Sequence, residues 1–106
     1  MLQGRYWTNS IKSLIETPED RAGPAGDLIA SLGGKLHALY FCFGRDDVVA
    51  IIEAPDDTTM AACSMEVGAS GTMSGGATTK LMTSAEAVTA MKQAGAAAGL
   101  YRGVGA

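Results

Sequence analysis

The sequence lacks an apolar run of the roughly 18–20 residues that a membrane-spanning helix needs, so we expect no association with membranes. It also lacks an excess of basic residues, because eight Lys and Arg against eleven Asp and Glu give a net charge of −3. The cations are scattered singly, whereas a nucleic-acid surface needs them clustered, so we expect no nucleic-acid partner. Residues 1–6 lack the charged and apolar segments of a signal peptide, which favours a cytoplasmic location.

Cysteine and histidine are scarce as well. The two cysteines, Cys42 and Cys63, lie in separate apolar segments without a C-x-x-C motif, which predicts buried free thiols. His37 is the only histidine, and no Cys, His, Asp or Glu residues cluster at the spacing of metal ligands. The glycines of residues 68–76 precede a strand pattern rather than a helix, and no Gly-x-Ser-x-Gly motif occurs. We therefore expect no metal and no cofactor.

Two pairs of adjacent acids, Asp46-Asp47 and Asp56-Asp57, have structural explanations. Aspartate in a turn accepts hydrogen bonds from local amides, and Asp56 stands where an N-cap would begin a helix. Because adjacent side chains in a turn point in different directions, we do not expect either pair to act in acid–base catalysis.

The 106 residues, 47% of them hydrophobic, are typical of one globular domain covering residues 1–106. The Gly- and Ala-rich end, from about residue 96 to residue 106, is expected to be a flexible tail. The hydrophobic pattern predicts strands at residues 2–8, 35–43, 48–52 and 72–82. It predicts helices from about residue 10, from Asp56, and from the capping box Thr83-Ser84-Ala85-Glu86.

The first helical region is expected to consist of pieces. Thr17-Pro18 offers a restart, and Gly23-Pro24 an interruption, because Pro24 lacks the amide proton that a continuing helix needs. The complete order is βαββαβ with an extra C-terminal helix. This order predicts an α+β fold of the ferredoxin-like type, with a four-stranded antiparallel sheet that helices cover on one face only.

The bare face of that sheet predicts a partner. The strands at residues 35–43 and 48–52 carry apolar residues on both sides, and an apolar face this large is seldom left to solvent. We expect a homodimer or a higher oligomer, with sheet-to-sheet contact as the simplest closure.

The hairpin register decides which side chains face that partner. If Phe43 pairs with Val48, then His37 and Glu53 lie on opposite faces and cannot form a dyad. An odd-length bulge in the turn would reverse this assignment. The helix-covered face is then expected to carry Leu36, Ala38 and Cys42, and the partner-facing side His37, Leu39, Phe41 and Phe43.

Several segments resemble a known family. They are Phe43-Gly44-Arg45-Asp46-Asp47-Val48-Val49, Glu53-Ala54-Pro55-Asp56-Asp57, Gln3-Gly4-Arg5-Tyr6, Pro18-Glu19-Asp20-Arg21, Gly33-Gly34-Lys35-Leu36 and Thr78-Thr79-Lys80-Leu81. Together they resemble the GYD-domain family of small bacterial proteins, named for a Gly-Tyr-Asp signature at the hairpin. Asp46 stands where many members have tyrosine. The resemblance implies a dimeric α/β barrel, in which two ferredoxin-like units close their bare sheet faces together, and it implies no established activity.

We favour a non-enzymatic function: an oligomer that binds a small apolar or amphipathic molecule between its sheets. The expected lining is His37, Leu39 and Phe41 with Tyr6 or Trp7, where His37 supplies a polar contact. The enzymatic alternative is a cofactor-free oxygenase or isomerase of the dimeric α/β-barrel type with His37 as general base. A third possibility is a purely structural assembly whose interior is filled by side chains.

Overall fold

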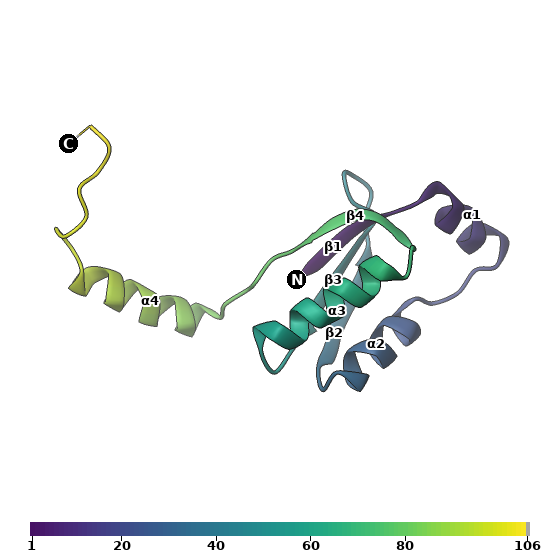
Figure 1. The fold of residues 1–106 in the computed structure, drawn as a ribbon, viewed down its shortest axis with the longest axis horizontal. Helices are drawn as coiled ribbons and strands as arrows, with labels where there is room; N and C mark the ends of the chain where they lie inside the picture. Colours follow the sequence, from purple (N-terminus) through teal and green to yellow (C-terminus); the bar gives the residue numbers. More distant parts are fainter. Residues whose placement is uncertain (106) are drawn as a thin grey trace.

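A computed structural model describes residues 1–105 and contains a four-stranded sheet and four helices (Figure 1). The elements in chain order are β1 (Leu2–Tyr6), α1 (Thr8–Glu16), α2 (Ala22–Ser31), β2 (Lys35–Phe41), β3 (Val48–Glu53), α3 (Asp57–Ala69), β4 (Met73–Thr78) and α4 (Ser84–Ala96). The strand order is β2-β3-β1-β4, and each neighbouring pair is antiparallel. The predicted α+β ferredoxin-like topology with an additional C-terminal helix is confirmed.

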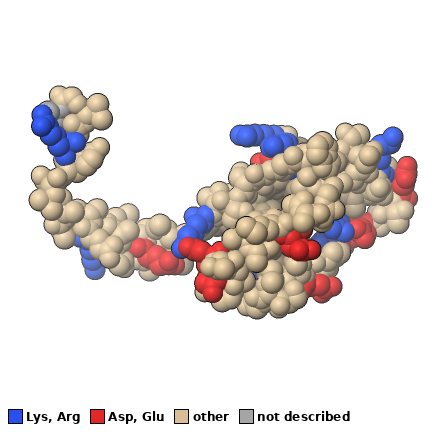
Figure 2. Space-filling model, in the orientation of Figure 1, with Lys and Arg blue, Asp and Glu red and all other residues tan. Residues whose placement is uncertain are grey.

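Helices α2 and α3 cover the same face of the sheet. Side chains of both helices and of the sheet border one shared space, and the buried residues Ile29, Val48, Ala50 and Cys63 lie around it. The opposite face carries Tyr40, which is 65% exposed, beside Val49 of the neighbouring strand. Acidic and basic side chains are scattered over the view in Figure 2 without a continuous area of either sign. No helix within residues 1–105 has the length and hydropathy of a membrane span.

The predicted helix starts at α3 and α4 are confirmed. The Asp56 carboxylate accepts a hydrogen bond of 2.7 Å from the Thr59 amide, which also lowers the pKa of Asp56. At α4 the Thr83 hydroxyl accepts a bond from the Glu86 amide, and the Glu86 carboxylate accepts one from the Thr83 amide. These local bonds satisfy amides that a helix start leaves unpaired, so sequence alone locates both starts.

The break in the first helical region lies elsewhere than predicted. Residues 17–21 separate α1 from α2, so Thr17-Pro18 does not restart a helix, and Gly23-Pro24 does not interrupt one. Pro24 lies in the first turn of α2, where amide protons have no partner within the helix. Proline is therefore tolerated at this position.

Strand β4 is shorter than predicted, because it ends at Thr78 and residues 79–83 leave the sheet toward α4. Beside it, the β1–β4 register shifts between Arg5 and Tyr6. A Cβ atom on Gly76 would collide with the Gln3 carbonyl oxygen, so only glycine permits this close approach of the two strands. The predicted tail begins as α4 ends, and its last residue, Ala106, lies outside the described residues.

The predicted register of the β2–β3 hairpin was wrong. Phe41 rather than Phe43 is opposite Val48, and the register shifts between Leu36 and Ala38. The shift inserts His37 as an extra residue in β2, and an extra residue reverses which face each following side chain occupies. A bulge in the turn would have reversed the assignment in the same way, but the irregularity lies inside β2.

This bulge overturns the predicted separation of His37 and Glu53. Their side chains lie on the same face, with 3.6 Å between His37 Nε2 and Glu53 Oε2. Leu36, opposite Ile52, lies on the helix-covered side as predicted, but the predicted faces of the residues after His37 were wrong: Leu39 and Phe41 lie on the helix-covered side and Ala38 on the open side. Phe43 is fully exposed beyond the end of β2.

The segment between β2 and β3 is bonded to β1. The Asp47 carboxylate accepts a 2.9 Å hydrogen bond from the Tyr6 amide, and the Asp47 amide donates to the Gly4 carbonyl at 2.8 Å. Arg5 Nη1 lies 2.9 Å from Asp46 Oδ1. The paired acids therefore act structurally, as predicted, although they bind a distant strand rather than local amides.

We predict that Asp47→Ala lowers the free energy of unfolding by about 1–3 kcal/mol, because it leaves the half-buried Tyr6 amide without its acceptor. Urea denaturation followed by circular dichroism measures this change. Asp27→Ala, which removes the same charge from the exposed side of α2, is the matched control and is expected to change stability by less than about 0.5 kcal/mol. Equal effects of the two substitutions would contradict the assignment.

Candidate functional site

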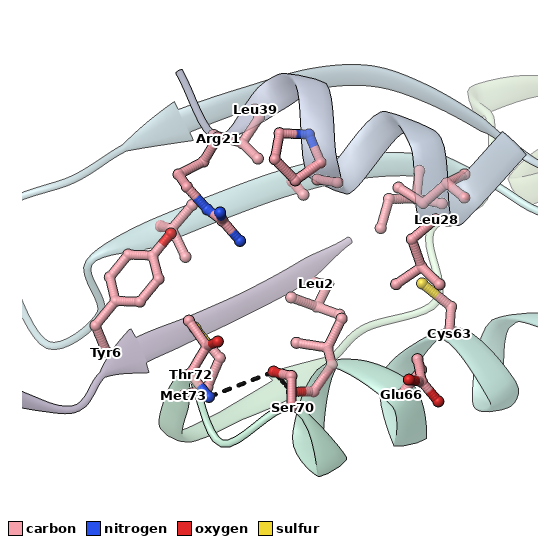
Figure 3. A pocket seen from close by; sticks show the side chains of 17 residues that line it. Leu2, Tyr6, Arg21, Leu28, Leu39, Cys63, Glu66, Ser70, Thr72 and Met73 are labelled. Carbon is pink, nitrogen blue, oxygen red and sulfur yellow. Dashed lines mark hydrogen bonds between the residues drawn. The ribbon is translucent and has the colours of Figure 1, made fainter. Parts of the chain in front are cut away.

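A cavity of about 320 Å³ lies between the helix layer and the sheet (Figure 3). Its floor comes from all four strands, its walls from α2 and α3, and its rim from the segments that precede α2 and β4. The lining residues are Leu2, Tyr6, Arg21, Pro24, Ala25, Leu28, Ile29, Leu39, Val48, Ala50, Ile52, Cys63, Glu66, Val67, Ser70, Thr72 and Met73. The cavity has the size of a small-molecule site, and most of its lining is apolar.

The sheet and helices position these side chains through their periodicity. Val48, Ala50 and Ile52 alternate along β3, so all three face the helices. On α3, Cys63 and Val67 are four residues apart and therefore share one helix face. The apolar floor and walls follow directly from these two repeats.

Tyr6 and Arg21 form the polar end of the cavity. In Figure 3 the Tyr6 hydroxyl is directed toward the Arg21 guanidinium group. Burial raises the pKa of the Tyr6 phenol, while the positive charge of Arg21 partly counteracts this rise. The phenol is therefore protonated near neutral pH and can donate a hydrogen bond. Arg21 Nη1 is held by Glu19 Oε1 at 2.5 Å, which orients the guanidinium group.

Cys63 and Glu66 lie at the end of the cavity away from Tyr6 and Arg21 (Figure 3). Cys63 is 4% exposed, and burial raises the pKa of its thiol. The thiol is therefore neutral and poorly nucleophilic at physiological pH. Both Cys63 and the half-buried Cys42 are free cysteines, as predicted from their spacing.

The predicted ligand-lining residues are divided between different surfaces. Tyr6 and Leu39 line the cavity, and Phe41 stacks on Tyr6 with ring centroids 5.9 Å apart. Trp7 is 54% exposed where β1 meets α1, and His37 lies beside Glu53 on the open face of the sheet. These five residues therefore do not border one common space, and a role for any of them in ligand binding remains a prediction.

Sequence reasoning missed Arg21, Cys63 and Glu66 as cavity residues. Arg21 follows Pro18-Glu19-Asp20, a pattern typical of a helix start. No sequence pattern near Arg21 indicates that it lies close to Tyr6 in the fold. The pattern that places Cys63 on the inward side of its helix could have indicated that this residue borders the cavity. Among residues 1–105, no group of three or more His, Cys, Asp or Glu residues could hold a metal ion.

The fold and cavity define a class: a small α+β domain of ferredoxin-like topology with a hollow space between its two layers. The family model described as GYD domain matches residues 1–91, which is most of the chain. The chain therefore belongs to the GYD domain family, and the resemblance inferred from its sequence segments is confirmed. No match was found among curated proteins or among solved structures.

We predict that Tyr6 ionises above its ordinary pKa of 10.0, because burial disfavours the phenolate. Since the folded-state pKa exceeds the unfolded one, the associated stabilisation is fully present below pH 10 and is lost as the pH rises through the folded-state pKa. Ultraviolet titration of the tyrosinate band is expected to lose its Tyr6 transition in Tyr6→Phe. Tyr101→Phe, in the exposed C-terminal segment, is the control that should retain this transition.

Proposed function

We propose that this domain binds a small amphipathic molecule in the cavity between its helices and its sheet. The supporting observation is the cavity itself, which holds about 320 Å³ beside the small buried core of Ile29, Val48, Ala50 and Cys63. Protein cores are normally packed as densely as organic crystals, so lining atoms beside an empty space lose dispersion contacts. A bound molecule restores these contacts. Exposed residues such as Glu66 and Ser70 border the space and leave it accessible from solvent.

The polar end supports a ligand with an acidic or hydrogen-bond-accepting group. Arg21 and the protonated Tyr6 both offer donors there, and a guanidinium group binds a carboxylate with charge-assisted hydrogen bonds. Glu19 already occupies one Arg21 nitrogen, so a ligand carboxylate would share or replace that partner. The apolar part of the ligand would extend toward Leu28 and Cys63.

Binding without catalysis is the function that the cavity supports better. The thiol of Cys63 is neutral, and His37, the general base of the enzymatic alternative, lies on the opposite face of the sheet. A molecule in the cavity is therefore out of reach of His37.

We predict that Ala25→Leu lowers the affinity for decanoate at least about tenfold, because the larger side chain occupies part of the cavity. Isothermal titration calorimetry measures the affinity. Ala30→Leu adds the same side chain at an exposed position of the same helix, so it is the matched control and should bind like the wild type. Equal binding by both variants would place the probe outside the cavity.

We predict that Arg21→Gln weakens decanoate binding by about tenfold to a hundredfold and leaves decanol binding within about twofold, because only the acid uses the charge. Arg45→Gln removes the same charge from the exposed β2–β3 turn and serves as the control. Parallel titrations of the acid and the alcohol measure the difference. An equal loss of affinity for both probes would argue against recognition of the acidic group.

A further inference from the structure

A second space lies on the other side of α3 from the first cavity. It holds about 370 Å³ and is bordered by strand β4 and by Ser64 and Gly68 of α3, and we call it the β4 groove. Because Gly68 and Gly76 have no side chains, they leave room between the helix and the strand. Exposed residues such as Ala77 border the groove, so it is open to solvent. The chain therefore has a second unfilled space beside the proposed binding cavity.

Helix α3 lies between the two spaces, and one of its residues borders both. Cys63 and Glu66 lie on the side of α3 that borders the first cavity. Ser64 and Gly68 lie on its other side and border the β4 groove. Val67 stands between these two sides of the helix and borders both spaces. The cavity and the groove are therefore neighbours beneath α3.

The boundary between the two spaces consists of a few adaptable side chains. On the sheet, Leu2 and Met73 border both spaces, as Val67 does on the helix. The Met73 methyl group occupies the place that a side chain on Gly4 would take, and methionine has three rotatable bonds, so it can move aside. Among the residues of α3, Cys63 alone is buried, so few side chains hold this helix on the sheet. A hydrocarbon chain can therefore pass from the cavity into the groove.

The groove differs from the cavity in its polar groups. None of the residues that border the groove is ionisable. Its hydroxyl groups already have partners, because Ser64 and Thr78 share a hydrogen bond of 2.9 Å and Ser74 donates to the Arg5 carbonyl at 3.2 Å. The cavity, in contrast, has the charged Arg21 at its polar end. The groove therefore suits a hydrocarbon chain rather than a second polar group.

We propose that the ligand of this domain is a long-chain carboxylic acid that occupies both spaces. Its carboxylate binds at Arg21 and Tyr6, and its hydrocarbon tail passes Val67 and Met73 into the β4 groove. This inference rests on the proposed function, because it extends the ligand that the first cavity binds. It adds the class of acid, since the groove contributes to binding only when the chain is too long for the cavity.

The first test compares hexadecanoate with decanoate by isothermal titration calorimetry, with each acid below the concentration at which it forms micelles. The wild type is expected to bind hexadecanoate at least about tenfold more tightly, because the groove removes additional methylene groups from water. Gly68→Leu fills the groove and should lower the affinity for hexadecanoate at least about tenfold, while decanoate binding stays within about twofold. Gly95→Leu on α4 is the matched control. Both glycines are exposed and helical, and a Cβ on either meets no atom within 4 Å.

The outcomes separate the groove from the proposed function. If the wild type binds both acids equally, or if Gly68→Leu and Gly95→Leu bind hexadecanoate equally, the role of the groove is overturned, while decanoate binding in the cavity still stands. If the wild type binds neither acid, both proposals are overturned. Retention of decanoate binding by Gly68→Leu also shows that this variant folds.

The second test uses the wild-type chain, so it does not depend on the folding of a variant. Hexadecanoate with a photoreactive diazirine at the end of its tail is bound and irradiated, and the labelled residues are identified by peptide mass spectrometry. The label is expected on β4 residues 73–78 and should disappear when unmodified hexadecanoate is added in excess. Decanoate with the same terminal group should label the first cavity instead, at residues such as Leu28. Hexadecanoate label confined to α2, or label that the unmodified acid does not displace, overturns the proposal.

Discussion

The two hydrogen bonds between Asp47 and β1 are the constraint on which much of the structure depends. They connect the turn of the β2–β3 hairpin to the central strand β1, at the Gly4 carbonyl and the Tyr6 amide. Through them the hairpin and the end of β1 hold one another, so that the Tyr6 ring stacks on Phe41 and its hydroxyl is directed toward Arg21. The turn segment therefore bonds to residues of β1 that lie about forty positions away in the sequence. Asp47 therefore helps to position Tyr6, although Asp47 itself does not line the cavity.

The two faces of the sheet have different surroundings. One face lies under α2 and α3 and borders a mostly apolar cavity with donors at one end. The other face carries Tyr40, Val49 and the His37–Glu53 contact and has no helix of its own chain over it among residues 1–105. Helix α4 lies away from both the sheet and the helices that cover it (Figure 1). A ligand in the cavity would cover apolar surface that the chain alone leaves accessible to solvent.

Local patterns predicted the order of strands and helices because they depend on near neighbours. The Asp56 cap and the capping box at Thr83 each satisfy amides within one helical turn, so they can be read from a few residues. The hairpin register could not be predicted in this way. A bulge at His37 depends on how two strands fit a shared sheet, and one extra residue exchanges the faces of all that follow. Likewise, no local pattern relates Arg21 to Tyr6, because the tertiary fold brings β1 and the start of α2 to the same end of the cavity.

The amino-acid sequence by itself determined the family, the topology and the starts of the later helices, because hydrophobic periodicity and capping are short-range properties of the chain. Only the tertiary structure decided which face His37 occupies, which residues border the cavity and where the C-terminal helix lies. The physical reason is the same in each case. Strand register, the space left between two packed layers and the direction of a linker depend on contacts between residues that are distant in sequence, and local periodicity carries no information about those contacts.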